Sequence, residues 1–318
     1  MKVVGVAQFG GPEALQVFEV PEPHAGYGQV RIRVLAASVN PGDRYLRNGS
    51  LVAVSAPPYI PGMEAAGRVD EIGPGTDTDL RVGDRVMAVT MPTEPRGGAY
   101  SQYLVLPAHA VVRAPAGASL AEAATLPMNG LTARLALDLA DVSTGQTLAV
   151  IGAAGVVGGY VTQMARAEGI TVVADAAPQD EELVRSLGAD MVVLRGPGVA
   201  HRILDAVPGG VDGLVDAAGL GSAAVAAAVH KGGAIVALNG DGLRLISPAE
   251  LRRRSLRRYL AFVPDYMGDQ GRLDRLRRQV EADEVTPRVA RVLSAEQASE
   301  AHRLMEAGGV RGRLVLEF

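Results

Sequence analysis

The sequence contains no cysteine and no tryptophan, and only 4% of its 318 residues are aromatic. Without cysteine, the chain has no disulfide framework, no thiolate nucleophile and no cysteine-ligated metal. The chain has few aromatic side chains that could stack on single-stranded nucleic acid, and its net charge of −4 also argues against binding to nucleic-acid phosphates. We therefore expect no nucleic-acid partner.

Long apolar runs are also absent. The first residues, MKVVGVAQFG, contain no apolar signal core, and no segment approaches the roughly 18 apolar residues that span a bilayer. We therefore expect a cytoplasmic protein with no membrane partner.

Several catalytic motifs are missing. Lysine occurs only at Lys2 and Lys231, and neither lies in a GxxxxGK[ST] phosphate-binding loop. Neither lysine follows a tyrosine at the Tyr-x-x-x-Lys spacing of short-chain dehydrogenases. The five histidines include no HExxH pair, so no zinc hydrolase site is visible.

The length and the hydrophobic content of 48% predict two domains, each with its own core. Residues 1–120 contain strand-like runs separated by glycine and proline, which is an all-β barrel pattern. Helix and strand alternate over residues 121–263, which predicts an open parallel sheet covered on both faces. Residues 264–318 contain a charged helix, a strand, a further helix and a final strand that would add edges to the first domain.

Two details of the second region are predicted more closely. The segment 119–140 is expected to be helical, with Ser119 as its N-cap and Glu122 completing a capping box. The buried strands are expected at six short apolar runs: LAVIG (148–152), TVVAD (171–175), MVVLR (191–195), GLVDAAG (213–219), AIVALNG (234–240) and LAFV (260–263).

The run LAVIGAAGVVGGYVTQMA, residues 148–165, predicts a phosphate-binding turn. The strand ends at Ile151, Gly155 lets the backbone approach a pyrophosphate, and Gly158 lets the next helix pack against the sheet. Amides at the helix N-terminus then face the anion, so we expect contacts from Ala154, Gly155, Val156 and Val157. The motif alone is weak, because Ala153 replaces a glycine of G-x-G-x-x-G and such clusters also serve tight packing.

Asp175 strengthens this interpretation. It ends the next strand, twenty residues after Gly155, where an acid accepts hydrogen bonds from the adenosine ribose and repels a 2′-phosphate. The alternative is that Asp175 caps a turn. The cofactor expected is NAD(P)H, and Asp175 favours NAD(H).

The sequence resembles the zinc-free quinone oxidoreductase branch of the medium-chain dehydrogenase/reductase family over nearly its whole length. The resemblance lies in AASVNPGDRYLRNG, PPYIPGMEAAGRVDEIGPG, GGAYSQYLVLP, AATLPMNGLTA, GAAGVVGGYVTQMARAEG and RGRLVLEF. It implies an α/β fold, in which a doubly wound Rossmann sheet is inserted in a GroES-like β-barrel catalytic domain, with the active site in the cleft between them.

The chain departs from the zinc-dependent members of that family. Where those carry a ligand cysteine it has Asn40, and where they carry Gly-His-Glu it has Gly62, Met63 and Glu64. We therefore expect no metal. Without a Lewis acid an alkoxide is poorly stabilised, so hydride addition to a quinone or a small conjugated carbonyl is favoured over alcohol oxidation.

The resemblance also implies site residues. Asn40 is expected beside the nicotinamide ribose and the substrate, and Tyr45 is expected to meet the substrate carbonyl; each has a packing or turn alternative. Thr132 matches a residue near the nicotinamide carboxamide, and Arg313 a basic position that reaches the pyrophosphate. Further cofactor contacts are expected where the fourth and fifth strands of the parallel sheet end, at Ala218, Leu238 and Asn239. Two aromatic residues, Tyr59 and Phe262, are expected to form walls of the substrate pocket.

One basic run, LRRRSLRRYL at residues 251–260, is interpreted as the solvated face of a helix. A nucleic-acid patch and a contact to a 2′-phosphate are the alternatives.

Three functional classes stay open. The chain is a free-standing reductase of quinones or enones, a trans-acting enoyl-thioester reductase, or a dinucleotide-binding sensor without catalysis. A small-molecule substrate and a homodimer joined through the nucleotide domains are expected.

Overall fold

The computed structural model describes residues 1–51, 56–95, 97–238 and 246–318. The chain divides into two compact units. The first contains Met1–Met128 and Tyr266–Phe318, and the second contains Asn129–Asp265.

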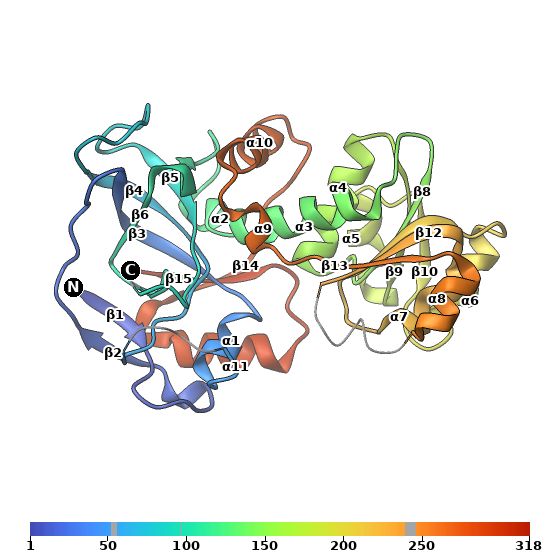
Figure 1. Cartoon of the computed structure of the whole chain (residues 1–318). Coiled ribbons are helices and arrows are strands. Elements are labelled where there is room, and N and C mark those ends of the chain that lie inside the picture. Colours follow the sequence, from blue (N-terminus) through green and yellow to red (C-terminus); the bar gives the residue numbers. More distant parts are fainter. Residues whose placement is uncertain (52–55, 96, 239–245) are drawn as a thin grey trace. The chain divides into compact units, whose positions relative to one another are not determined.

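The first unit is built on a seven-stranded sheet (Figure 1). Its order is β14-β15-β3-β4-β5-β7, and β6 pairs with β3 in addition. Only the β14–β15 pair is parallel. The strand bounds are β3 Gln29–Val39, β4 Glu64–Ile72, β5 Arg85–Val89, β6 Tyr103–Pro107, β7 Val111–Arg113, β14 Val289–Ser294 and β15 Arg313–Glu317; β1 Lys2–Gly5 and β2 Gln16–Glu19 form a separate hairpin.

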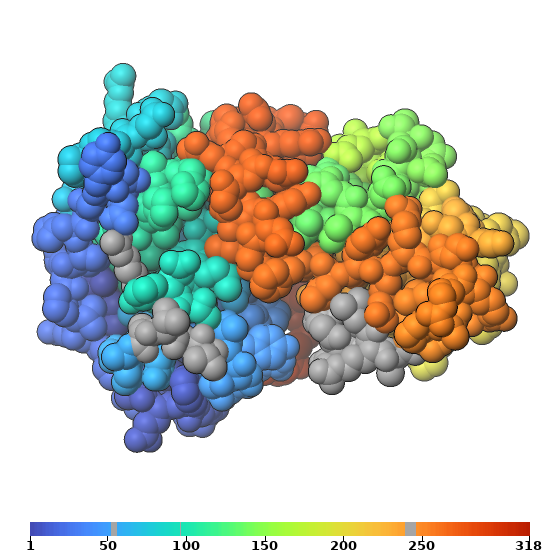
Figure 2. Space-filling view, in the orientation of Figure 1, coloured from blue at the N-terminus to red at the C-terminus, as the bar shows by residue number. Residues whose placement is uncertain are grey.

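The core of this unit follows from strand alternation. Val30, Ile32 and Val34 of β3 are buried, whereas Arg33 between them is exposed. Both ends of the chain contribute to the unit, since β15 pairs with β3. Figure 2 shows part of this C-terminal segment, in orange and red, packed against teal residues of the first unit.

Helices of the first unit pack around the sheet. The α10 helix begins after Asp269, whose side chain accepts a hydrogen bond from the Arg272 N–H. The helix bounds are α1 Asp43–Arg47, α2 Leu120–Ala123, α10 Gln270–Glu281 and α11 Ala298–Ala307. The short helix α9, Pro264–Met267, includes the point in the sequence where the second unit ends and the first resumes.

The second unit is a six-stranded, wholly parallel sheet in the order β10-β9-β8-β11-β12-β13. Numbered along the chain from β8, this is the strand order 3-2-1-4-5-6 of the Rossmann fold, as predicted. The strands are β8 Thr147–Ile151, β9 Thr171–Ala176, β10 Met191–Leu194, β11 Val211–Asp216, β12 Val229–Ala237 and β13 Arg257–Leu260; the helices are α3 Pro127–Ala140, α4 Val156–Ala167, α5 Glu181–Ser186, α6 Val199–Ala206, α7 Ser222–Val225 and α8 Pro248–Arg254.

Three local predictions are corrected. The expected helix 119–140 is two helices, because Pro127 lacks an N–H donor and begins α3 afresh; the Ser119–Glu122 capping box is present. The last parallel strand, β13, begins at Arg257, three residues before the start of the expected run LAFV at Leu260. The β15 strand lies inside the sheet, between β14 and β3, so of the two C-terminal strands only β14 forms an edge.

The basic run 251–260 is not one helix face. The α8 helix ends at Arg254, and Ser255 has a left-handed φ of 54°, so Arg257 and Arg258 lie on β13. Arg252 and Arg253 are exposed as expected. Arg254 instead donates 2.6 Å hydrogen bonds to the Ala226 and Val229 carbonyls.

Among the described residues, no helix is both long and apolar enough to cross a bilayer.

Candidate functional site

The turn from β8 into α4 has the geometry predicted from its glycines. Gly152 has a φ of +81°, which lets the chain leave the strand sharply. Gly155 is exposed and forms the N-cap of the twelve-residue α4. A Cβ atom on Gly158 would lie 2.8 Å from the carbonyl carbon of Gly152 and closer still to its oxygen, so only glycine lets α4 pack here.

Asp175 stabilises this turn from the neighbouring strand. Its Oδ1 accepts a hydrogen bond from the Gly152 N–H at 2.6 Å, and the side chain is almost wholly buried. Burial raises the pKa of Asp175, while hydrogen bonds from the Gly152 and Ala153 amides and the charge of Arg195 lower it. The alternative interpretation of Asp175 as a turn-capping residue therefore has direct support.

Asp216 was missed from the sequence. It ends β11, and its Oδ1 accepts from the Ala218, Gly219 and Leu220 amides, while Oδ2 accepts from that of Gly221. An aspartate closing a buried strand before the glycine-containing DAAGLG was the available signal. The Ala218 amide is thus taken up within the protein.

The turn fits a dinucleotide pyrophosphate. In an α-helix the first four N–H groups have no intrahelical acceptor, and the N-terminus carries partial positive charge. Here the Gly155 N–H donates to the Gly152 carbonyl at 2.9 Å, so a ligand would meet the amides of Val156 and Val157. Gly155 is exposed and places no side chain over the start of the helix.

The first unit holds a second cluster, centred on Asn40 at the end of β3. Asn40 is 3% exposed, and its Nδ2 donates to Ser38 Oγ at 3.2 Å and to Glu64 Oε1 at 2.9 Å. Both amide hydrogens are therefore engaged. Its Oδ1 accepts no hydrogen bond from any described residue, so the group left for a ligand is an acceptor, suited to a hydroxyl.

Glu64, at the start of β4, organises this cluster. Its Oε1 also accepts from the Ser38 hydroxyl at 2.5 Å, and Oε2 accepts from the Met128 N–H at 2.7 Å. Burial raises the pKa of Glu64; these hydrogen bonds and the charge of Arg313 lower it. Arg313, predicted to contact a pyrophosphate, is thus found near Glu64 within its own unit.

Tyr45 lies on α1 and is 40% exposed. Its hydroxyl accepts a hydrogen bond from Arg44 Nη2 at 3.2 Å, and the Arg44 guanidinium lies 5.0 Å from the ring centroid. Because Arg44 uses only the oxygen, the hydroxyl hydrogen of Tyr45 is available to donate.

The remaining predicted residues are dispersed. Tyr59 stacks on Phe9 with ring centroids 4.7 Å apart, as a packing residue does. Phe262 is 57% exposed in the second unit. Thr132 is half-buried on α3, and Leu238 directly follows β12. Asn239 lies outside the described residues.

A second residue missed from the sequence is Arg195. It follows β10 and is exposed, its N–H donates to the Ala176 carbonyl at 2.9 Å, and its charge lowers the pKa of Asp175. Residues 176–180, which directly follow Asp175, include no basic residue, so the local sequence gives no sign of Arg195. Pairing of β10 with β9 brings Arg195 to the same edge of the sheet.

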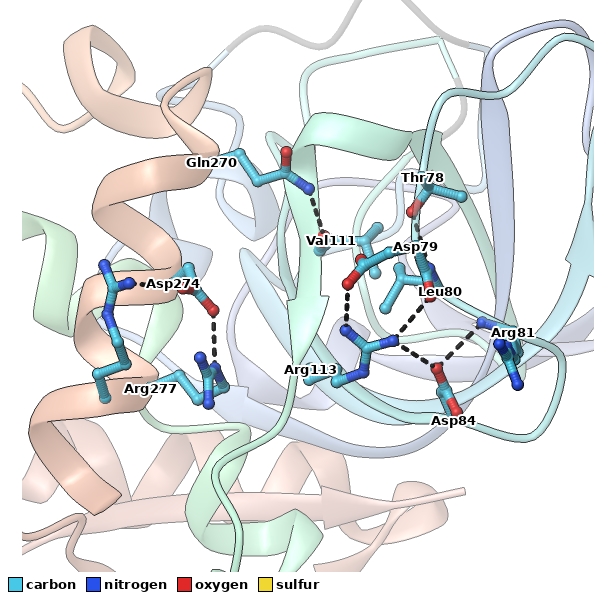
Figure 3. Close-up of polar contacts among 11 residues, drawn as sticks. Thr78, Asp79, Leu80, Arg81, Asp84, Val111, Arg113, Gln270, Asp274 and Arg277 are labelled. Atoms are coloured by element: carbon cyan, nitrogen blue, oxygen red, sulfur yellow. Dashed lines mark hydrogen bonds and ion pairs between the residues drawn. The ribbon is translucent and has the colours of Figure 1, made fainter. Parts of the chain in front are cut away.

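A cavity of about 460 Å³ lies elsewhere in the first unit, between α10 and β7 (Figure 3). Its arginines are already paired: Arg113 with Asp79 and Asp84, and Arg277 with Asp274 and Glu281. None of the predicted site residues lines it. We therefore do not place the chemistry there.

Within the described part of the chain, no group of three or more histidine, aspartate or glutamate side chains is arranged to hold a metal ion. The positions that correspond to zinc ligands by the resemblance hold Asn40, Met63 and Glu64.

Comparison with known proteins decides the family. Residues 26–116 match the family described as "Alcohol dehydrogenase GroES-like domain", and residues 187–316 match "Zinc-binding dehydrogenase". A "Probable quinone oxidoreductase" of Schizosaccharomyces pombe is 30% identical over 328 residues, covering 99% of this chain and 96% of the relative. The chain belongs to the quinone oxidoreductase branch of the medium-chain dehydrogenase/reductase family.

Two further members of the medium-chain family are similar to the chain. The "NADPH-dependent alkenal/one oxidoreductase, chloroplastic" of Arabidopsis thaliana is 32% identical over 248 residues, covering 76% of this chain and 63% of the relative's own length. The crystal structure of an NAD-dependent alcohol dehydrogenase superposes with a TM-score of 0.91 at 29% identity, covering 100% of both chains. The predicted fold, a GroES-like domain with a Rossmann sheet, is confirmed.

Proposed function

We propose that the protein transfers a hydride from NAD(P)H to quinones or small α,β-unsaturated carbonyl compounds, without zinc. The observation that carries this proposal is the turn from β8 into α4, where Gly155 opens the helix N-terminus and Gly158 packs on Gly152. Family membership supports it, since similar proteins are named as reductases of quinones and of alkenals and enones.

The second unit would hold most of the dinucleotide. The amides of Val156 and Val157 would bind the pyrophosphate, and Asp175 would face the adenosine ribose. The Gly155 N–H donates to the Gly152 carbonyl at 2.9 Å, so Gly155 would admit the phosphates by its lack of a side chain, and Ala154 stays a predicted contact. Thr132, Ala218, Leu238 and Asn239 stay predicted contacts, as does Arg313 of the first unit. Since Asp216 takes up the Ala218 amide, Ala218 would contribute its methyl group or carbonyl oxygen.

The first unit would supply the groups around the reacting atoms. The bound reduced nicotinamide supplies a hydride. Asn40, with its free acceptor Oδ1, would hold a hydroxyl of the nicotinamide ribose. The Tyr45 hydroxyl would donate to the substrate carbonyl oxygen, on which negative charge develops; one such donor in a dry site contributes about 3 kcal/mol. The final proton comes from Tyr45 or from water. Tyr59 and Phe262 stay predicted pocket walls.

Zinc independence is supported by the residues themselves. Glu64 already accepts hydrogen bonds from Ser38, Asn40 and Met128, and Asn40 and Met63 stand where relatives carry cysteine and histidine. Activity should therefore survive prolonged dialysis against a chelator. Loss of activity on dialysis, restored by zinc, would contradict this part of the proposal.

For the nucleotide we propose a preference for NADH. Asp175 lies at the end of β9, where a carboxylate repels a 2′-phosphate. Arg195 lies close enough to lower the pKa of Asp175, and its positive charge would favour the 2′-phosphate of NADPH.

The decisive experiment follows the oxidation of NADH and of NADPH with a quinone, an enone and an enoyl thioester in parallel. Turnover of the quinone or enone supports the proposal. Turnover of the thioester alone favours the trans-acting enoyl reductase. Saturable nucleotide binding with no turnover of any acceptor favours the sensor.

We also propose a homodimer in the cytoplasm, with catalytic segments 1–120 and 264–318 and a nucleotide-binding domain 121–263. The two compact units support the division, and β13, which pairs only with β12 among the described strands, gives the second unit an open edge. Light scattering tests the dimer, and cell fractionation tests the location.

A further inference from the structure

A chain of hydrogen bonds runs through the core of the first unit, from Arg47 on α1 through His302 on α11 and Tyr100 to Asp43, which is also on α1. Arg47 Nη1 donates to His302 Nδ1 at 3.0 Å, and His302 Nε2 lies 3.2 Å from Tyr100 Oη. Tyr100 Oη donates to Asp43 Oδ2 at 3.1 Å. All four side chains are at most 3% exposed. Figure 1 shows α1, which carries Arg47 and Asp43, beside α11, which carries His302.

The chemistry of arginine fixes the direction of the chain. A guanidinium has no acceptor, so Nδ1 of His302 must accept the hydrogen bond from Arg47. Burial, with a smaller effect of the Arg47 charge, lowers the pKa of His302 to about 3, so the ring is neutral at physiological pH and carries its hydrogen on Nε2. That hydrogen goes to Tyr100, whose own hydrogen goes to Asp43.

Asp43 is the end point, and it joins two loops. Its Oδ2 also accepts from the Asn40 N–H at 2.8 Å, and its Oδ1 accepts from the Gly62 N–H at 2.9 Å. Asn40 follows β3 and Gly62 precedes β4, so one carboxylate fixes the backbone on both sides of the Asn40 cluster.

We propose that Asp43, Tyr100 and His302 are positioning residues for Asn40, and that the chain started by Arg47 keeps Asp43 ionised so that it holds the Asn40 and Gly62 loops. The inference deepens the proposed function and rests on the role given there to Asn40. None of these side chains need touch the substrate.

Protonation of Asp43 would break the arrangement. All three of its hydrogen-bonding neighbours are donors, so a carboxylic O–H would have no acceptor unless Tyr100 withdrew its hydrogen. Tyr100 cannot pass that hydrogen back to His302, because Arg47 already occupies the acceptor nitrogen. The loops would then lose part of their anchor.

Burial of Asp43 places its protonation near neutral pH. Burial and the charge of Glu64 raise the pKa of Asp43 to about 7, against the hydrogen bonds from Asn40, Gly62 and Tyr100. The charge of Arg313 lowers the pKa of Glu64, and Glu306 pairs with Arg47 at 2.6 Å at the start of the chain. Removing the Tyr100 hydroxyl should therefore move this pKa upward.

The first test compares Tyr100→Phe with the matched control Tyr103→Phe, which removes a hydroxyl from β6 of the same unit. We expect the acid limb of the kcat pH profile to move up by about one pH unit in Tyr100→Phe, with KM for the acceptor nearly unchanged. The control should keep the wild-type profile. An unmoved acid limb in Tyr100→Phe would overturn the proposal.

The second test uses His302. Glutamine can accept from Arg47 through its oxygen and donate to Tyr100 through its nitrogen, whereas leucine can do neither. We expect His302→Leu to lose about tenfold in kcat and His302→Gln to recover most of that loss. Equal activity of the two variants would overturn the directed chain.

A third measurement does not depend on turnover. Amide hydrogen exchange at Asn40 and Gly62 should become about tenfold faster in Asp43→Asn and Tyr100→Phe, but not in Tyr103→Phe. If the wild type reduces no acceptor, the proposed function fails while this exchange still tests the positioning chain. Unchanged exchange in Asp43→Asn would refute the chain even in an active enzyme.

Discussion

Asn40 Nδ2 lies 2.9 Å from Glu64 Oε1, so a buried carboxylate holds the amide of the residue placed nearest to the proposed chemistry. The same carboxylate accepts from Ser38 and from the backbone of Met128. The orientation of Asn40 is therefore set by Glu64, and Oδ1 is the atom of its amide that accepts from no described residue.

Replacing Glu64 by glutamine tests this relationship. Ser38, Asn40 and the Met128 N–H donate to the two carboxylate oxygens of Glu64. Glutamine has only one acceptor oxygen, so at least one of these buried donors loses its partner. We expect the free energy of unfolding to fall by about 2 kcal/mol and kcat to fall with it. Urea denaturation and steady-state kinetics measure the two effects. Glu22→Gln, at an exposed position, is the control, and equal behaviour of the two variants would contradict the prediction.

Gly158→Ala tests the turn from β8 into α4. The new methyl group would press on the Gly152 carbonyl, so α4 must shift away from the sheet. We expect destabilisation by about 1–3 kcal/mol and weaker NAD(P)H binding. Gly209→Ala is the matched control in the same unit, because a Cβ there meets nothing within 4 Å. Wild-type stability and nucleotide affinity in Gly158→Ala would argue against the close packing.

Arg195→Ala and Asp175→Asn test the nucleotide preference in opposite directions. Asparagine keeps an oxygen for the Gly152 N–H but removes the charge that repels a 2′-phosphate. We expect Asp175→Asn to improve NADPH binding relative to NADH by about tenfold, and Arg195→Ala to weaken NADPH selectively. Fluorescence titration with both nucleotides gives the ratio. A ratio unmoved by either change would place the ribose elsewhere.

The free energy of unfolding should depend on pH through Asp43 and His302, and the two residues should change it in opposite directions as the pH rises. The pKa of Asp43 is raised to about 7, so between its ordinary value and 7 the folded protein binds the extra proton, and stability falls as pH rises. The pKa of His302 is lowered to about 3, so up to its ordinary value the unfolded chain binds the extra proton, and stability rises with pH.

The two slopes oppose each other in the wild type between about pH 4 and pH 6.5. We expect Asp43→Asn to leave a stability that rises with pH across this window, and His302→Gln to leave one that falls. Urea denaturation at a series of pH values measures both. Slopes of the same sign in the two variants would show that one of the shifts is misassigned.

Much of the fold could be predicted from local pattern. The apolar runs predicted the parallel sheet, and the glycine spacing at 152, 155 and 158 predicted a close turn from β8 into α4, because strand periodicity and helix packing act over a few residues. The start of β13 could not be predicted this way. It depends on Ser255 ending α8 in a left-handed conformation, which nothing in LRRRSLRRYL requires.

The site was harder to predict, because it depends on residues far apart in the sequence. Asn40 was found through resemblance, but its engagement by Glu64 joins residues 24 apart. His302 meets Arg47 across 255 residues, and no local spacing signals such a pair. Arg195 lies near Asp175 only because β10 pairs with β9.

The place of β15 has a consequence for biosynthesis. Residues 129–265 are continuous, so the parallel sheet can form while the ribosome is still adding residues. The other sheet needs Arg313–Glu317 to fill the gap between β3 and β14. Until those residues have been synthesised, residues 36–39 of β3 lack β15 as their partner strand, because β6 pairs only with residues 29–33.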